Sequence, residues 1–227
     1  MSTAIAPPPI SIAPQIAAPP STPLPASTPP PAHTDPFGGL DYIRKFTVDE
    51  YHEMIKAKIL TEDDPVELLE GYLVLKMPRS PAHDYAISTL YKRLCKLIPD
   101  SYFLQSQCAA TFDTSEPEPD FTIARGPETD YRKKHPGPSD SAVVIEVSSS
   151  SLRRDRGFKS QIYARGGIPI YWVVNVDERK IEVYSHPSGS GEAAVYARCT
   201  EYAETDAVPL VLDGQTFGSI AVADVMA

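Results

Sequence analysis

The sequence predicts an α/β domain in which a mixed sheet is flanked by helices. Two runs, Val143–Val147 and Pro169–Val176, are almost wholly apolar, as expected of strands buried on both faces. The segment 81–98 carries apolar residues at helical spacing, and Ser80-Pro81 supplies an N-cap and a first-turn proline. Buried strands together with an amphipathic helix indicate helices packed on a sheet.

The N-terminal elements come before the predicted sheet. Thr47-Val48-Asp49-Glu50 fits a capping box and predicts a short helix at 47–58. Residues 66–77 form two extended pieces around Glu70-Gly71, which is typical of a β-hairpin. An N-terminal helix and a hairpin are therefore expected beside the core.

The remaining elements follow in chain order after the helix at 81–98. They are an extended segment at 102–112, a strand at 120–124, a loop at 125–139, the strand at 143–147, a helix at 155–165 with Phe158 and Ile162 on one side, the strand at 169–176, a strand at 180–185 paired with it, and a hairpin-like periphery after 186. The core order is helix, strand, strand, strand, helix, strand, strand.

The chain of 227 residues divides into a tail and a body. Residues 1–36 hold 12 of the 24 prolines, and the first charged residue is Asp35. We expect 1–36 to be a disordered Pro-rich tail and 37–227 to be one domain. The tail is a flexible extension or a docking element for a protein partner of the SH3 type.

Composition excludes several classes of protein. No apolar run approaches the ~20 residues of a membrane span, so no membrane partner is expected. Three cysteines without CxxC spacing argue against a disulfide framework and favour a reducing, cytoplasmic location. The formal charge of −9 argues against a globally basic nucleic-acid binder.

Glu146 is the first candidate for chemistry, because it lies within the apolar run at 143–147. A buried carboxylate costs several kcal/mol unless it is paired or binds a metal. The alternative is an edge strand whose Glu146 faces solvent. Asp120 begins the preceding short strand, where an aspartate by itself is common. Two carboxylates and a carbonyl on neighbouring strands would suit Mg²⁺, or Mn²⁺ in its place.

Lys159 lies on the helix that follows the Glu146 strand. Asp155, four residues earlier, offers it a solvated ion pair on the helix surface. In the other arrangement its ammonium points to the two carboxylates, where it orients a water or stabilises negative charge on phosphorus.

Several motifs in this order resemble the Uma-type putative restriction endonucleases of the PD-(D/E)XK nuclease superfamily, over about residues 42–186. The matching pieces are Val66-Glu67-Leu68-Leu69-Glu70-Gly71, Ser80-Pro81-Ala82-His83, Ser115-Glu116-Pro117-Glu118-Pro119-Asp120, Val144-Ile145-Glu146-Val147-Ser148, Asp155-Arg156-Gly157-Phe158-Lys159 with Tyr163, and Gly167-Ile168-Pro169-Ile170-Tyr171-Trp172-Val173-Val174. The resemblance implies a restriction-endonuclease-like αβββαβ core.

The resemblance also implies roles for particular residues. Asp120 and Glu146 would be the metal carboxylates, with the Val147 carbonyl completing the site. The superfamily's lysine normally stands two residues after this glutamate, where this chain has Ser148. The resemblance then implies that Lys159 on the next helix replaces it.

Three further residues are candidates for the site. Glu67 supplies a further acidic ligand or is an exposed strand residue, and His83 contacts a phosphate or has a capping or packing role. Gln107, before the Asp120 strand, is a candidate hydrogen-bond partner within the site.

The basic residues are concentrated around these candidates. Residues 125–165 contain nine basic and five acidic residues, against a charge of −13 for the rest of the chain. Phosphate contacts require such cations. The candidate phosphate contacts are Arg132, Lys133, Lys134, Arg153, Arg154 and Arg156. A solvated basic loop is the alternative.

The leading hypothesis is a Mg²⁺-dependent endonuclease that hydrolyses phosphodiester bonds through activated water. DNA is the expected substrate, although the residues do not distinguish it from RNA, and a homodimer is compatible with double-strand cutting. The alternative is an inactive nucleic-acid-binding or regulatory module on the same fold, for which Ser148 and the net acidity argue.

Overall fold

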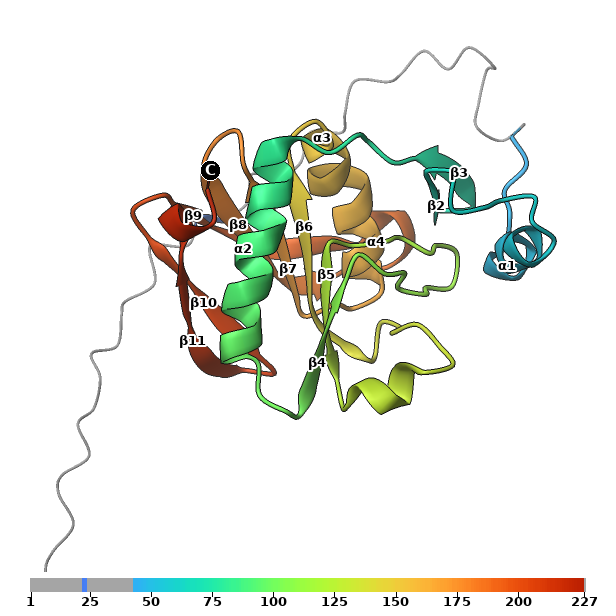
Figure 1. Cartoon of the computed structure of the whole chain (residues 1–227). Helices are drawn as coiled ribbons and strands as arrows, with labels where there is room; N and C mark the ends of the chain where they lie inside the picture. Colours follow the sequence, from blue (N-terminus) through green and yellow to red (C-terminus); the bar gives the residue numbers. More distant parts are fainter. Residues whose placement is uncertain (1–21, 24–42, 227) are drawn as a thin grey trace, which may run out of the picture.

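The computed structural model describes residues 22–23 and 43–226, and it confirms the predicted α/β class (Figure 1). A mixed sheet of seven strands has the order β1-β9-β8-β7-β6-β5-β4. The strands are β1 (Thr22–Pro23), β4 (Tyr102–Ser106), β5 (Phe121–Arg125), β6 (Ser141–Ser148), β7 (Ile170–Asn175), β8 (Lys180–Ser188) and β9 (Val195–Ala203). Within this sheet, β6 and β7 pair in parallel and every other neighbouring pair is antiparallel.

The predicted disordered tail at 1–36 lies outside the described residues, apart from Thr22–Pro23, which pair with β9. The division of the chain at residue 36 therefore stays a prediction.

Both faces of the sheet are covered. Helix α2 (Pro81–Leu97) and the hairpin of β10 (Ala207–Leu212) and β11 (Gln215–Ala221) pack on one face. A continuous helical stretch covers the other face (Figure 1): α3 (Leu152–Arg154), the π-helix Asp155–Lys159 and α4 (Ser160–Arg165).

Strand β6 lies between these two layers, and all eight of its residues are buried. Because side chains alternate along a strand, Val143 and Ile145 join the α2 core while Val144 joins the α4 core. Glu146 has the same parity as Val144, so it points toward the helix that carries Lys159.

The predicted helix starts are confirmed at α1 (Val48–Lys56) and α2. Glu50 donates its backbone N–H to Thr47 Oγ1 at 3.1 Å, and its side chain accepts the Thr47 N–H at 3.0 Å. Ser80 Oγ accepts the backbone N–H of His83 at 3.2 Å. This cap sets where α2 begins and therefore where His83 stands.

The helix predicted at 155–165 differs from the prediction in its phase. Phe158, expected on the same face as Ile162, is exposed, whereas Ile162 is buried. Residues 155–159 are π-helical, so the spacing of 3.6 residues per turn does not carry across them. Lys159 takes a buried place in this segment.

The segment after 186 is more than periphery. Strand β9 joins the main sheet beside β8. Val208, Leu210, Leu212 and Ile220 of the β10–β11 hairpin are buried in the α2 core. Buried and more exposed side chains alternate along β10, so one face of the hairpin packs into this core.

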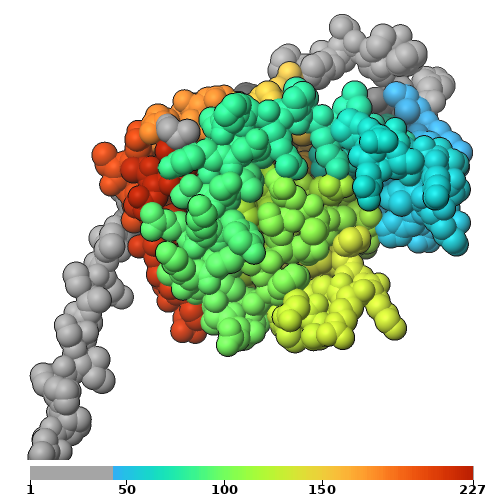
Figure 2. Space-filling view, in the orientation of Figure 1, coloured from blue at the N-terminus to red at the C-terminus, as the bar shows by residue number. Residues whose placement is uncertain are grey.

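Strands β2 (Val66–Leu69) and β3 (Tyr72–Leu75) form the predicted hairpin. In Figure 2 the N-terminal segment that contains them, blue to cyan, lies at one end of the visible face, and Leu68 of β2 forms a bridge with Glu116. Glu70 and Gly71 of its two-residue turn both have positive φ, 53° and 83°, as a type I′ turn requires. A Cβ on Gly71 would lie 2.7 Å from Lys45 Cβ.

Gly71→Ala should therefore destabilise the protein more than Gly214→Ala. Gly214, with φ 84°, occupies the same place in the two-residue β10–β11 turn, but nothing lies within 4 Å of its added Cβ. Both changes cost about 1–2 kcal/mol for left-handed backbone. Gly71→Ala adds ~1–3 kcal/mol of overpacking. Urea unfolding of both variants measures the difference, and equal losses would contradict it.

Candidate active site

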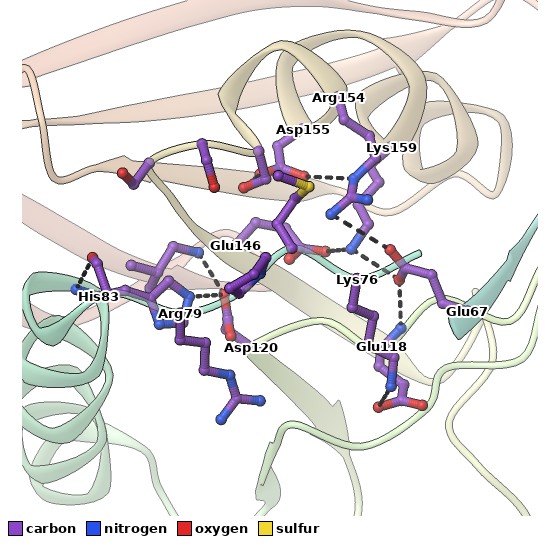
Figure 3. A pocket seen from close by; sticks show the side chains of 17 residues that line it. Glu67, Lys76, Arg79, His83, Glu118, Asp120, Glu146, Arg154, Asp155 and Lys159 are labelled. Carbon is purple, nitrogen blue, oxygen red and sulfur yellow. Dashed lines mark hydrogen bonds and ion pairs between the residues drawn. The ribbon is translucent and has the colours of Figure 1, made fainter. Parts of the chain in front are cut away.

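A pocket of about 250 Å³ opens where β6 ends, between the β3–α2 connection and the start of α3 (Figure 3). Its polar lining comes from elements far apart in the chain. The charged and histidine side chains that line it are Glu67, Lys76, Arg79, His83, Glu118, Asp120, Glu146, Arg154, Asp155 and Lys159. The structure thus brings together Asp120, Glu146, Lys159, Glu67 and His83, five of the candidates from the sequence.

Glu146 lies at the floor of this pocket and is 4% exposed. Its Oε1 accepts hydrogen bonds from Lys159 Nζ at 3.0 Å and from the Tyr163 hydroxyl at 2.6 Å. Burial raises the pKa of Glu146 to about 8, although the charge of Lys159 lowers it. A carboxyl group with so high a pKa is typical of functional sites.

Lys159 is the cation of this floor and is 3% exposed. Its ammonium lies 3.0 Å from Glu67 Oε2 as well as 3.0 Å from Glu146 Oε1 (Figure 3). Burial lowers the pKa of Lys159, but the surrounding carboxylates, led by Glu146, outweigh burial and the net pKa is raised. Lys159 therefore carries its charge between two buried carboxylates from different strands.

Asp120 stands directly before β5, beside the Glu146 strand. Its Oδ2 accepts the Val147 N–H at 2.8 Å. The β5–β6 pairing begins at Phe121 and Ile145, so Val147 lies just past the end of β5. The N–H and C=O of one strand residue face the same edge. The Val147 carbonyl is therefore directed toward the Asp120 side, as the predicted donor set requires.

His83, in the first turn of α2, contacts Asp120. Its Nε2 lies 3.4 Å from Asp120 Oδ2. Burial lowers the pKa of His83, but the hydrogen bond and charge of Asp120 outweigh burial, and the pKa is raised. The Ser80 cap fixes the backbone of His83, and the contact with Asp120 fixes its side chain.

Ser148, in the place of the superfamily's lysine, binds Asp155 and makes no hydrogen bond to Asp120 or Glu146 among the contacts of the described residues. Asp155 Oδ2 accepts from Ser148 Oγ at 2.7 Å and from Ser151 Oγ at 2.5 Å. Burial raises the pKa of Asp155, against the lowering effect of Lys159. The pair fastens the end of β6 to the helix that carries Lys159.

Gln107 and most of the candidate phosphate contacts lie elsewhere. Gln107 follows β4 and accepts from Arg79 at 3.2 Å at the edge of the site. Arg132, Lys133 and Lys134 follow the Arg125 end of β5, away from Asp120. The guanidinium of Arg156 is engaged by Glu182 and Glu178, and Arg153 is exposed outside the pocket lining.

Arg154 is the one member of that predicted set that lines the pocket in the described structure. It donates to the Leu75 carbonyl at 2.9 Å, and its NH2 atom lies 3.8 Å from Glu67 Oε1. Its Nε and Glu67 Oε1 are both buried without a hydrogen-bond partner. The Nε atom lies 4.0 Å from Asp155 Oδ1, so the guanidinium of Arg154 stands between two carboxylates of the pocket lining.

The sequence interpretation missed four charged lining residues: Lys76, Arg79, Glu118 and Asp155. Lys76 pairs with Glu118 at 2.6 Å, and the backbone of Glu118 donates to Glu67 Oε2 at 3.2 Å. The position of Lys76 and Arg79 in the sequence could have indicated them, because both lie between the predicted hairpin and the predicted Ser80 cap, directly before the candidate His83.

Five carboxyl groups face four Lys and Arg side chains in the pocket, so its charge is close to balanced while Glu146, with a pKa of about 8, keeps its proton. Within the described residues, no three His, Cys, Asp or Glu side chains are already grouped as a metal centre. Lys159 instead forms ion pairs with both deeply placed glutamates, Glu67 and Glu146.

This arrangement defines a class, a restriction-endonuclease-like α/β protein with a pocket rich in carboxyl groups at the end of the buried strand β6. The chain belongs to the Uma2 family, described as putative restriction endonucleases, whose model matches residues 48–222. Its fold is similar to the crystal structure of a putative nuclease belonging to DUF820 from Anabaena variabilis. The two share 16% identity with a TM-score of 0.57, over 79% of this chain and 97% of that one.

No curated protein matches the chain. Among the described residues, no helix combines the length and the apolar character needed to cross a bilayer.

Proposed function

We propose that this chain is a divalent-metal-dependent nuclease that hydrolyses phosphodiester bonds, in DNA and with Mg²⁺ as the natural cation. The observation that carries the proposal is the buried cluster of Asp120, Glu146 and Lys159 at the floor of one pocket. Family membership and the likeness to a putative nuclease support it.

The residues present fit a hard divalent cation. Asp120, Glu146 and the Val147 carbonyl offer oxygen donors at neighbouring strand positions, which is what Mg²⁺ and Mn²⁺ prefer. The ionised carboxylates beside the strand ends would repel a phosphate, and a dication held by them would give the pocket a positive charge. Bound there, the metal would lower the pKa of water and neutralise charge on the phosphoryl group.

The chain's own residues have separable roles in this proposal. Lys159 places a positive charge at the floor, where it orients the attacking water or stabilises charge on phosphorus. Glu67 holds the same ammonium from the opposite side, so Lys159 keeps a partner when Glu146 binds metal. His83 and Arg154 are positioned to contact a phosphate oxygen.

The purified protein should nick or cut DNA with Mg²⁺ or Mn²⁺ and should not with EDTA. Calorimetric titration with Mn²⁺ gives a second readout that does not depend on catalysis, and Asp120→Asn should weaken that binding. Glu62→Gln, which changes an exposed turn residue, is the control. Cleavage that is unaffected by EDTA would refute the proposal, whereas DNA binding without cleavage under all metals would favour an inactive binding module.

Three related expectations stay predictions: a cytoplasmic location, a homodimer, and a protein partner for residues 1–36. RNA is the alternative substrate, and parallel cleavage assays on RNA of the same sequence decide between the two.

A further inference from the structure

The connection between β3 and α2, residues 76–80, forms one wall of the pocket. All five of its residues line the cavity. Met77 is 47% exposed, although it lies at the mouth of a polar site. Lys76 stands beside it, and Arg79 follows two residues later. An exposed, flexible apolar side chain is thus flanked by two cations.

The groups at the floor lie deeper than this wall. Asp120 is 9% exposed and Glu146 is 4% exposed. The cavity of about 250 Å³ corresponds to roughly eight water volumes at ~30 Å³ each. This is room for a phosphate and its adjacent sugar, and it leaves the attached bases at the mouth, beside Met77.

We propose that the pocket takes a single-stranded segment of nucleic acid, with one phosphodiester at the floor and a neighbouring base against Met77. Lys76 and Arg79 would then contact the flanking phosphates. The inference rests on the proposed function and specifies its substrate class.

Two physical arguments favour a single strand over a duplex. A stacked duplex is stiff, with a persistence length of about 150 bp, so it cannot lower one phosphate into a narrow cavity without distortion. A single strand turns freely, and proteins bind it by combining cations with side chains that contact base faces. Methionine adapts its shape to different partners, so it suits contact that is independent of base identity.

Fluorescence anisotropy of the full chain tests the proposal, with Ca²⁺ in place of Mg²⁺. The probes are an oligonucleotide of about 15 nucleotides, within the reach of single-strand sites, and its blunt duplex. The single strand should bind ~10-fold more tightly at equal salt. Met77→Ala should weaken single-strand binding about fivefold or more, and Met77→Trp should strengthen it, because stacking on a larger ring is more favourable.

Ile59→Ala is the matched control, because Ile59 is 67% exposed and lies outside the pocket lining. It should change neither affinity. Equal binding of both probes, or no response to Met77→Ala and Met77→Trp, overturns the inference while leaving metal-dependent cleavage intact. Single-strand binding through Met77 by a protein that cuts nothing would refute the proposed function alone.

Discussion

Asp120→Asn should reduce metal-dependent cleavage by about 1,000-fold while leaving the fold intact. A metal ion contributes several kcal/mol to charge stabilisation in such a reaction, and each 1.4 kcal/mol is a factor of ten in rate. The amide of asparagine keeps an oxygen that can accept the Val147 N–H, so the hydrogen bond now measured at 2.8 Å can persist. Asp120→Asn therefore removes the negative charge that would bind the metal and leaves the fold unchanged.

Two measurements separate these effects. Initial rates on a single-stranded oligonucleotide and on a supercoiled plasmid give the activity, and urea unfolding gives the stability of the same preparation. Asp100→Asn removes an exposed aspartate and should change neither. Retention of more than about a tenth of the activity in Asp120→Asn would show that Asp120 holds no essential metal.

Lys159→Met should lower the free energy of unfolding by about 3–5 kcal/mol, the cost of leaving buried charge without its partner. Methionine fills similar space, so the loss reflects charge and not a cavity. Glu67 and Glu146 would both lose the ammonium that now lies 3.0 Å from each. Lys159→Arg should retain part of the stability, since its charge persists.

The loss should grow as pH rises. Glu146 has an ordinary pKa of 4.5 and a folded-state pKa of about 8 even beside Lys159, and removing the cation raises it further. Between pH 4.5 and about pH 8 both folded proteins keep this proton, so both lose stability equally with rising pH; above about pH 8 only the variant keeps the proton, so its stability continues to fall and the loss grows. Unfolding measured near pH 7 and at about one pH unit or more above 8 tests this sign.

An exposed lysine provides the control for that experiment. Lys133 is exposed on the loop after β5. Lys133→Met should therefore leave the free energy of unfolding nearly unchanged at both pH values. Equal stability of Lys159→Met and the native protein near pH 8 would contradict the ion-paired floor.

Much of the candidate site was predictable because its residues violate local patterns. Glu146 interrupts an apolar run, and the cost of burying a carboxylate alone predicts a partner for it. The caps at Thr47 and Ser80 are equally local, since they depend on residues three positions apart. Strand and helix order followed from such patterns, and the structure confirms the class.

Other features depend on contacts that no local pattern records. Glu67 and Lys159 are 92 positions apart in the sequence, and only the docking of the hairpin against the helix brings them within 3.0 Å. The π-helical turn that buries Lys159 and exposes Phe158 also escapes a spacing of 3.6 residues.

The distribution of positive charge shows the same division. By itself, the sequence determined the α/β class and the acidic excess and pointed to Glu146 as a buried carboxylate, because these follow from composition and short-range periodicity. Only the tertiary structure decided which cations face the carboxylates. Lys133 and Lys134 leave from the far end of β5, whereas Lys76 and Arg79 reach the pocket from the β3–α2 connection. Charge acts over distances in space, and chain order does not encode those distances.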